Sequence, residues 1–355
     1  MSAFPQLEAF RRIRSGAGAT YRVIQPLGQG GNSHVYLVEA MTAPFQGLLF
    51  ALKLFVKVSD ATRLKRFSRE VEFFKKCQHP AIMRVYDLGE IDEAGTKFPF
   101  VIADYLPRTL YDAMRSGLTM MEKTSFVLQL LSAAAYMEKE EPQIVHRDIK
   151  PENIFVRGKG CILGDFGLMK ILEKPSKPPE AANQKVGVAA PKSTTAILKV
   201  DDESKSAASA DSIKNQIVIE VAAVSVEEEE DREHVITSTG PRLPRFYRTP
   251  DLVDYCRKKG ELTTKSDVFQ LGLVFTELFS GKNPLKAAKH IYDPIELDPM
   301  GEIPGSQASA IKAHLKQMLE LNPANRPAAS ELFDPWEGIF KESAQISLQL
   351  EGRVF

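Results

Sequence analysis

Two short motifs combine acidic and amide side chains in a pattern suited to chemistry on phosphate. The first covers residues 146–153 (HRDIKPEN), and the second covers residues 165–167 (DFG). Phosphoryl transfer needs a carboxylate that orients the attacking hydroxyl and separate oxygen ligands that hold Mg²⁺ on the nucleotide phosphates. Asp148 can supply the carboxylate, whereas Asn153 and Asp165 can supply the oxygen ligands. The two motifs therefore indicate chemistry on a nucleotide.

Together the motifs resemble the catalytic and metal-binding loops of the eukaryotic-type (Hanks-type) Ser/Thr protein kinases, and the resemblance covers nearly the whole chain. It implies ATP as phosphoryl donor, Mg²⁺ as cofactor and Ser/Thr hydroxyls of protein substrates as acceptors. Asp148 would then act on the acceptor hydroxyl, and Asn153 and Asp165 would bind the metal. Lys150 is typical of Ser/Thr rather than tyrosine kinases and could neutralise charge on the transferring group. His146 is expected to be structural.

Residues 27–35 (LGQGGNSHV) form a glycine-rich stretch between two β-like segments. Glycines allow a turn to lie close over a triphosphate, so that backbone N–H groups face the phosphates. The stretch resembles the kinase glycine-rich loop with two departures, because Ser33 replaces the third glycine and Asn32 replaces a common aromatic residue. The resemblance implies nucleotide contacts from nine positions: Leu27, Gly28, Gln29, Gly30, Gly31, Asn32, Ser33, His34 and Val35.

The resemblance assigns further residues to the nucleotide. Lys53 matches the strand lysine that contacts the α- and β-phosphates, and Glu70 has the spacing of its helix partner. Glu72 is the alternative partner, although it would face another side of the helix. Residues 103–106 (ADYL) resemble the hinge that binds adenine through Asp104 and Leu106. The small Ala103 predicts an open cavity behind the adenine, and the purine would be enclosed by Val35, Ala51 and Phe155.

Residues downstream of the two motifs resemble the parts that support a kinase site. Asp251 stands where a glutamate usually pairs with a buried arginine, and Arg326 is the matching arginine. Asp is one methylene shorter, so this pair needs a closer approach. Asp267 resembles the helix residue that braces the catalytic loop.

The elements that must hold these residues divide the chain into a β-rich half and a helical half. Apolar patterns predict strands over residues 21–24, 35–38, 48–55, 83–90 and 98–104. Helical periodicity predicts helices over 64–77, 110–114, 124–138 and 266–280, and a short amphipathic helix around Phe4, Leu7 and Phe10. This order of elements resembles the plan of the protein kinases, so the expected fold class is α+β, the two-lobe protein-kinase fold. A small antiparallel β-sheet lobe with one main helix precedes a larger, mainly α-helical lobe.

The predicted domains are an N-terminal extension (1–18), a small lobe (19–105), a large lobe (106–342) and a C-terminal tail (343–355). Residues 171–236 read as a flexible insertion, because no aromatic residue occurs between Gly167 and Arg245 to build a core. Two readings of the insertion stay open. It is either largely disordered, with a transient strand in the apolar run 217–226, or a hairpin that docks on the large lobe.

Hydroxyl residues just after this insertion are candidates for regulation. Thr239 lies close to the usual position of an activating phosphothreonine, with Thr237 and Ser238 as alternatives. A phosphate there would add roughly −1.5 to −2 charge, which Arg147 could bind to order the segment. The opposite reading, that these are hydroxyls of a polar loop, also stays open.

Composition restricts the partners. The 355 residues contain 46 Lys+Arg and 46 Asp+Glu, so no global charge favours nucleic acid. The three cysteines have no paired or metal-type spacing, and residues 1–19 have no continuous apolar core of a signal peptide. The best apolar stretch, 271–279, is interrupted by Thr276 and Glu277 and is too short to span a bilayer. These features predict a cytoplasmic protein without a membrane span, and they leave its oligomeric state open.

Three functions remain to be compared. The first is an active Ser/Thr protein kinase, and the second is a pseudokinase that binds nucleotide or only a partner. The third is a small-molecule kinase of related fold. The presence of Lys53, Asp148 and Asp165 favours an active kinase over a pseudokinase, and Arg326 with residues 247–251 (YRTPD) favours a protein kinase over a small-molecule kinase.

Overall fold

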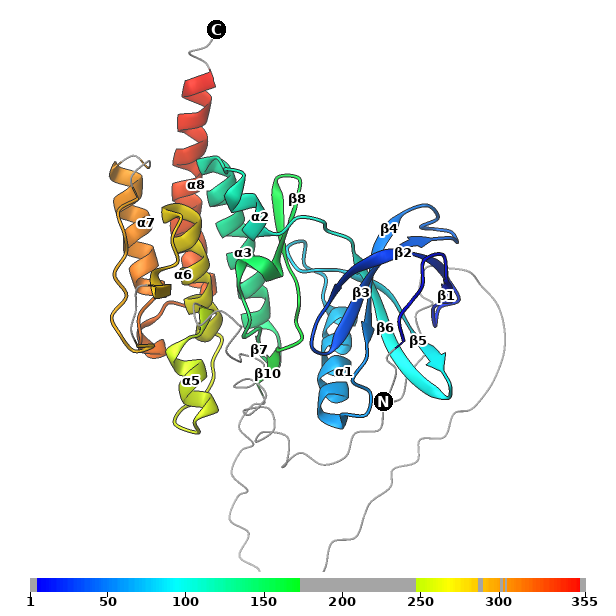
Figure 1. Cartoon of the computed structure of the whole chain (residues 1–355). Coiled ribbons are helices and arrows are strands. Elements are labelled where there is room, and N and C mark those ends of the chain that lie inside the picture. Colours follow the sequence, from blue (N-terminus) through cyan, green and yellow to red (C-terminus); the bar gives the residue numbers. More distant parts are fainter. Residues whose placement is uncertain (1–4, 173–246, 287–289, 301–302, 304, 352–355) are drawn as a thin grey trace, which may run out of the picture.

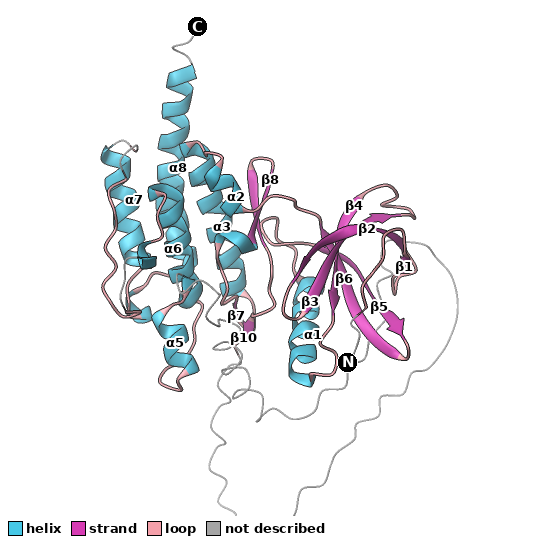
Figure 2. Ribbon diagram, in the orientation of Figure 1, coloured by secondary structure: helices cyan, strands magenta, loops and turns pink. Residues whose placement is uncertain are grey.

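The computed structural model describes residues 5–172, 247–286, 290–300, 303 and 305–351. They form a β-sheet lobe from the first part of the chain and a helical lobe from the rest (Figures 1 and 2). One hydrophobic core lies in the sheet lobe, and a larger core fills the helical lobe. The larger core also includes Phe73 and Phe74 of α1 (Ala61–Lys76), so this helix belongs to both lobes. The prediction of a two-lobe α+β fold is confirmed.

The small lobe is built on a six-stranded antiparallel sheet with the order β1-β2-β3-β4-β6-β5. Its strands are β1 (Arg12–Arg14), β2 (Thr20–Gln29), β3 (Ser33–Ala40), β4 (Leu49–Phe55), β5 (Val85–Glu93) and β6 (Thr96–Asp104). The core face is marked by side chains without exposed surface: Val23, Val38, Leu52 and Ile102. Because β4 lies inside the sheet, Lys53 is opposite Val35 of β3 and Val101 of β6.

The N-terminal segment forms a strand and loops, so the predicted amphipathic helix is wrong. Phe4 lies outside the described residues, Leu7 packs into the small-lobe core, and Phe10 is exposed. β1 pairs with β2, and Gly16 donates its backbone N–H to the carbonyl of Leu88 in β5 at 2.8 Å. The segment thereby links both edges of the sheet, where backbone groups would otherwise lack partners.

α1 is the main helix of the small lobe. Asp60 caps its first turn, because the aspartate carboxylate accepts the backbone N–H of Arg63 at 3.0 Å. Two lysines in the last turn suit the negative end of the helix dipole. The helix points Glu70 inward together with its buried aromatic residues Phe67, Phe73 and Phe74.

The large lobe contains α2 (Leu110–Arg115), α3 (Met120–Lys139), α5 (Pro250–Cys256), α6 (Lys265–Ser280), α7 (Gly305–Met318) and α8 (Ala329–Glu351). Capping boxes fix the starts of α2 and α3, where Thr109 pairs with Asp112 and Thr119 pairs with Glu122. α6 contacts α3 and α7 and is buried along nearly its whole length. Among the described helices, none has the length and apolar character needed to cross a membrane.

Four short strands fix the two sequence motifs as loops. They are β7 (Ile144–Val145), β8 (Ile154–Arg157), β9 (Gly160–Leu163) and β10 (Lys170–Ile171). β8 and β9 form an antiparallel hairpin, and β7 pairs with β10. Residues 146–153, hereafter the HRD loop, therefore lie between β7 and β8. Residues 164–169, hereafter the DFG loop, lie between β9 and β10. Both loops are held at both ends by strand pairing.

Two predicted segments have more regular structure than expected. The flexible insertion is predicted from residue 171, but Ile171 pairs in β10 and Leu172 donates its N–H to the carbonyl of Gln143 at 2.8 Å. The C-terminal tail is predicted from residue 343, but α8 continues without a break to Glu351. In both places backbone hydrogen bonds extend an element beyond the point where the sequence pattern weakens.

Candidate active site

Two side chains of α6 hold the backbone of the HRD loop. Asp267 accepts the N–H of His146 at 2.7 Å and the N–H of Arg147 at 3.0 Å. Gln270 accepts the N–H of Ile149 at 2.9 Å and donates to the carbonyl of Arg147 at 3.0 Å. Asp267 and Gln270 are both buried, so these bonds are shielded from competition with water. Burial raises the pKa of Asp267 to about 7, against the lowering effect of the two N–H donors.

The backbone of both loops contains a left-handed residue. Arg147 has φ of 69° and Asp165 has φ of 54°. Such conformations are costly for residues other than glycine and persist where the surroundings impose them. At Arg147 the backbone groups are bonded to α6, and the side chain donates to the carbonyls of Leu168 and Met169. Arg147 therefore joins the HRD loop to the DFG loop.

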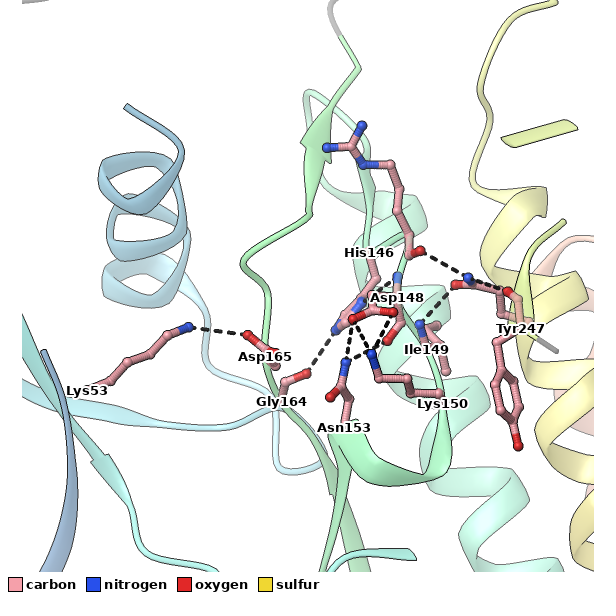
Figure 3. A network of polar contacts seen from close by, with 11 residues as sticks. Lys53, His146, Asp148, Ile149, Lys150, Asn153, Gly164, Asp165 and Tyr247 are labelled. Atoms are coloured by element: carbon pink, nitrogen blue, oxygen red, sulfur yellow. Dashed lines mark hydrogen bonds and ion pairs between the residues drawn. The ribbon is translucent and has the colours of Figure 1, made fainter. Parts of the chain in front are cut away.

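Asp148 lies in a cluster with Lys150 and Asn153. The ammonium of Lys150 contacts both carboxylate oxygens of Asp148, at 3.0 and 2.8 Å, and Asn153 Nδ2 donates to Asp148 Oδ2 at 2.9 Å. Burial raises the pKa of Asp148, and the nearby Lys150 opposes this shift. A carboxylate with a raised pKa that is still partly accessible is suited to accept a proton. Figure 3 shows the three side chains pointing toward one another.

Lys53 lies between the carboxylates of Glu70 and Asp165. In Figure 3 it is on the side of Asp165 that faces away from Asp148. Its ammonium is 2.7 Å from Glu70 Oε1 and 3.3 Å from Asp165 Oδ1. Burial lowers the pKa of Lys53, but the two carboxylates outweigh this effect and raise it overall. Lys53 lowers the pKa of Asp165. Glu70 is thus the partner in the structure, whereas Glu72 forms an exposed contact of 2.8 Å with Lys75.

An aromatic cluster joins α1 to both loops. The ring of Phe166 has no exposed surface and lies 4.8 Å from the ring of Phe73, 5.1 Å from that of Phe74 and 4.4 Å from that of His146. His146 Nε2 lies 3.0 Å from the carbonyl oxygen of Gly164. Burial lowers the pKa of His146 to about 4. A neutral, fully buried imidazole is suited to packing, in keeping with the structural role expected for it.

The nine positions of the glycine-rich stretch form the end of β2, a turn and the start of β3. β2 supplies residues 27–29, the turn covers 30–32, and β3 begins at Ser33. The turn is closed by the N–H of Gly30, which donates to the carbonyl of Ser33 at 2.8 Å. Leu27 is exposed, with 40% of its surface accessible. His34 and Val35 lie opposite Leu54 and Lys53 in β4, so the stretch lies directly beside the lysine.

The adenine-binding residues expected from the sequence lie where the two lobes meet. Ala51 and Ala103 are opposite each other in β4 and β6. Asp104 is fixed by its backbone N–H to the carbonyl of Arg84 at 3.1 Å and by its carboxylate to Tyr86 Oη at 3.0 Å. Leu106 follows where β6 ends and the chain enters the large lobe.

Phe155 reaches this region from β8. A Cβ on Gly164 would lie 2.9 Å from Phe155 Cε2 and 2.8 Å from Met83 Cε. A side chain at the position before Asp165 would therefore require Phe155 and Met83 to shift, and Phe155 packs directly against the start of the DFG loop.

Asn153 and Asp165 carry oxygen atoms that suit a divalent cation. Asn153 donates through Nδ2 to Asp148, so its amide oxygen is the atom that can accept a cation. Gly164 donates its N–H to the carbonyl of Asn153 at 2.9 Å, which ties the two predicted ligands together. Mg²⁺ is commonly bound by one or two protein oxygens together with substrate phosphates. Within the part of the chain that the structure describes, no group of three or more His, Cys, Asp and Glu forms a separate metal cage.

Asp251 and Arg326 form a buried ion pair beside the first turn of α6. The guanidinium Nη1 of Arg326 is 2.8 Å from Asp251 Oδ1, with 0% and 4% of the two side chains exposed. Ser266, in the first turn of α6, also donates its hydroxyl to Asp251. Arg326 further donates to the carbonyls of Glu320 at 2.6 Å and Leu321 at 2.9 Å. The shorter aspartate therefore reaches the arginine, as the predicted pair requires.

Two contributors to the site were not expected from the sequence. Gln270 braces the HRD loop beside Asp267, and its signal is a polar residue three positions after Asp267 in an otherwise apolar run of α6. Arg63 contacts the tip of the glycine-rich stretch at Asn32, 2.7 Å away, and no local pattern indicates that contact. The predicted regulatory residues Thr237, Ser238 and Thr239 lie outside the described residues, as does most of the predicted insertion.

Comparisons with known proteins agree with this geometry. The family described as "Protein kinase domain" matches residues 21–193, and the family described as "Protein tyrosine and serine/threonine kinase" matches residues 212–335. Neither match includes residues 194–211, which fall in the predicted insertion. The matches therefore cover both lobes of the structure.

Several curated proteins are similar to the chain. The serine/threonine-protein kinase pkn2 of Myxococcus xanthus is 33% identical over 174 residues, 46% of this chain and 19% of that protein. PrkC of Bacillus subtilis is 33% identical over 156 residues, 43% of this chain and 23% of that protein. PknF of Mycobacterium tuberculosis is 31% identical over 164 residues, 44% of this chain and 34% of that protein. The aligned region thus spans only about a fifth to a third of these relatives.

The HRD and DFG loops, the Lys53–Glu70 pair and the two-lobe fold occur together in one chain, and both family matches fall on the lobes that carry them. The chain belongs to the eukaryotic-type (Hanks-type) Ser/Thr protein kinase family.

Proposed function

We propose that this protein is an active Ser/Thr protein kinase that transfers the γ-phosphoryl group of ATP to hydroxyls of protein substrates. The observation that carries the proposal is the arrangement of Lys53, Glu70, Asp148, Asn153 and Asp165, which the paired HRD and DFG loops bring close together. A pseudokinase has no need to keep all of these groups in contact. The arrangement therefore favours catalysis over nucleotide binding alone.

In the proposed reaction Asp148 accepts the proton of the substrate hydroxyl. The hydroxyl oxygen forms a bond to the γ-phosphorus while the bond from that phosphorus to the β–γ bridging oxygen breaks, and ADP leaves. Lys150, in contact with Asp148, places a positive charge beside the transferring group. The raised pKa of Asp148 supports its role as proton acceptor.

On the nucleotide side, Lys53 would bind the α- and β-phosphates while Glu70 holds its ammonium in place. The turn 30–32 would cover the phosphates, and Ala51, Phe155 and Val35 would enclose the purine. Asn153 and Asp165 would hold Mg²⁺, which neutralises phosphate charge when bound. The hinge residues Asp104 and Leu106 would offer backbone groups to the adenine.

A transfer assay tests the proposal. Purified protein is incubated with γ-labelled ATP, Mg²⁺ and casein as a generic acceptor, with Asp148→Asn as the inactive control. We expect label on casein or on the protein itself, and no label when EDTA is added before the ATP or when the Asp148→Asn variant replaces the wild type. Phosphoamino-acid analysis should find phosphoserine and phosphothreonine. Nucleotide binding without transfer in the wild-type protein would instead support the pseudokinase.

We also propose that phosphorylation at Thr239, or at Thr237 or Ser238, regulates the activity. The support is the position of these residues before the 247–251 motif and the presence of Arg147 between the two loops. Mass spectrometry of the protein after incubation with ATP, with Asp148→Asn as control, tests this mechanism. Absence of phosphate at 237–239, or full activity with alanine at all three positions, would contradict it while leaving the kinase proposal intact.

A further inference from the structure

The tip of the glycine-rich turn is fixed by two hydrogen bonds to elements outside the turn. The carbonyl of Asn32 accepts the backbone N–H of Val56, just after β4, at 2.9 Å. The side-chain oxygen of Asn32 accepts a hydrogen bond from Arg63 Nη1 of α1 at 2.7 Å. A glycine-rich turn has few side chains of its own to restrict it, so contacts at its tip decide how freely it moves. Asn32 is the residue in the turn that provides such contacts.

Arg63 is itself fixed at the start of α1. Its Nε lies 2.9 Å from Asp60 Oδ2, and its backbone N–H donates to Asp60 Oδ1 at 3.0 Å. The guanidinium is planar, so binding Asp60 through Nε orients Nη1 toward Asn32. Asp60 caps the helix through the backbone of Arg63 alone. The contact with Asn32 is therefore separate from the requirements of the helix cap.

Arg63 and Glu70 lie on one face of the same helix. Seven residues are close to two turns, so the two side chains project from one face at a spacing of about 10 Å along the axis. Glu70 binds Lys53 at 2.7 Å, and Lys53 is opposite Val35 at the end of the glycine-rich stretch. The chain of contacts is closed: the turn is held by α1 through Arg63, and β4 is held by α1 through Glu70.

We propose that Arg63 is a positioning residue that holds the glycine-rich turn over the nucleotide phosphates and couples the turn to the Lys53–Glu70 pair. A displacement of α1 that separates Glu70 from Lys53 also withdraws Arg63 from Asn32, because one rigid helix carries both side chains. Asn32 is suited to this role because an aromatic residue at the tip has no side-chain carbonyl to accept the bond. The inference rests on the proposed use of ATP.

Kinetics of the full chain test the proposal. Arg63→Ala should raise the KM for ATP about three- to tenfold, the effect of losing one charge-assisted hydrogen bond, and change kcat less than about twofold. Asn32→Ala should have the same effect, and the double variant should be no worse than either single variant. Arg63→Lys should restore part of the affinity. Lys75→Ala, which removes an exposed cation from the same helix, is the matched control and should match wild type.

Hydrogen exchange without nucleotide provides a readout that does not depend on activity. In Arg63→Ala, backbone amides of residues 29–33 should exchange faster, whereas amides in the middle of α1 should be unchanged. An unchanged KM together with unchanged exchange would overturn the proposal, and so would a lower KM in Arg63→Ala. If the wild-type protein transfers no phosphate, the proposed function fails. Exchange and the binding of a fluorescent ATP analogue then still decide the role of Arg63.

Discussion

The HRD-loop side and the nucleotide side of the site, which consists of the glycine-rich turn and Lys53, are held by different kinds of contact. The HRD loop is fixed through its backbone by Asp267 and Gln270, two buried side chains of a buried helix. The glycine-rich turn is fixed by the charged side chain of Arg63, which water reaches, and Lys53 is partly exposed although its partner Glu70 is buried. Lys53 is 22% exposed and Arg63 is 32% exposed. Buried, fully bonded networks impose one geometry, whereas exposed ion pairs contribute little stability and are weakened by salt.

This difference matches what each side has to do in the proposed reaction. Asp148 acts on a hydroxyl at a fixed distance, so its backbone gains from a geometry that does not vary. The nucleotide side has to admit ATP and release ADP, so contacts that break at small cost suit it. The comparison predicts that variants on the HRD-loop side change stability or chemistry strongly. Variants on the nucleotide side should change nucleotide handling with smaller losses of stability.

The largest effect on stability is expected from Arg326→Ala, at the start of α6. The change leaves Asp251 as a buried charge without its partner, so the free energy of unfolding should fall by about 3–5 kcal/mol. Urea unfolding followed by circular dichroism measures it. Lys341→Ala, which breaks an exposed contact with Glu337, is the control and should cost at most about 1 kcal/mol. A cost below 1 kcal/mol for Arg326→Ala would contradict the view that buried, fully bonded contacts hold this side of the site.

Asp148→Asn separates the chemistry of the HRD loop from its support. Activity should fall at least about 10²-fold, because the amide cannot accept the proton, while the melting temperature stays within a few degrees. Asp165→Asn should behave in the same way through loss of metal binding. Steady-state kinetics and thermal unfolding of the same preparations give both quantities. Near-normal turnover in Asp148→Asn would refute the assignment of this residue.

His146 predicts a pH dependence of stability that belongs to the HRD-loop side of the site. Its pKa is lowered to about 4 in the folded protein, below the ordinary value of 6.5, so the folded state favours the neutral ring. The stability due to this shift is present above pH 6.5 and is lost as pH falls toward 4. Between pH 7 and 4.5 the loss should be about 2 kcal/mol.

The test compares His146→Gln with the wild type by urea unfolding at several pH values. The variant can still donate to the carbonyl of Gly164 but cannot titrate, so its loss of stability below pH 6.5 should be smaller by that amount. His290→Gln, at an exposed position, should follow the wild type. Parallel curves for His146→Gln and wild type would show that the imidazole does not titrate in this window.

Glu70→Gln tests the nucleotide side of the site. Loss of the carboxylate leaves Lys53 beside Asp165 alone, so transfer should slow about tenfold. The loss of stability should be smaller than for Arg326→Ala, because Lys53 keeps a charged partner and is 22% exposed. Glu72→Gln changes a neighbouring carboxylate that faces away and should have no effect. Single-turnover rates at two salt concentrations, together with urea unfolding, test this prediction. Equal effects of the two variants would show that the contact between Glu70 and Lys53 does not contribute to the transfer rate.

The smallest effect is expected at Ala103, behind the adenine position. Its side chain is small and lies opposite Ala51 and Val85 in the sheet. An ATP-competitive analogue with a bulky N6 group should therefore inhibit the wild type several-fold better than Ala103→Met, with little difference in the KM for ATP. Inhibition constants measured at equal ATP saturation decide this. An analogue that inhibits both proteins equally would place the hinge in a different register.

Particular elements show how far the sequence could be read. The strands that carry Val35, Lys53 and Asp104 were recognisable because each combines a long apolar run with a short motif. β1 was not recognisable, because a strand of three residues has no periodicity and depends on β2 for its hydrogen bonds. The helix expected around Leu7 failed for a related reason. Apolar residues at helical spacing also suit a loop that packs on a sheet, and the segment joins the sheet edges instead.

By itself the sequence determined the residue types of the site and their order, because the chemistry of phosphoryl transfer restricts which side chains stand in the two motifs. The tertiary structure alone decided which of Glu70 and Glu72 meets Lys53, that Gln270 braces the HRD loop, and that Arg63 reaches Asn32. These contacts join residues that are distant in sequence. Their partners are selected by how α1 and α6 pack, and packing depends on the whole chain rather than on any local pattern.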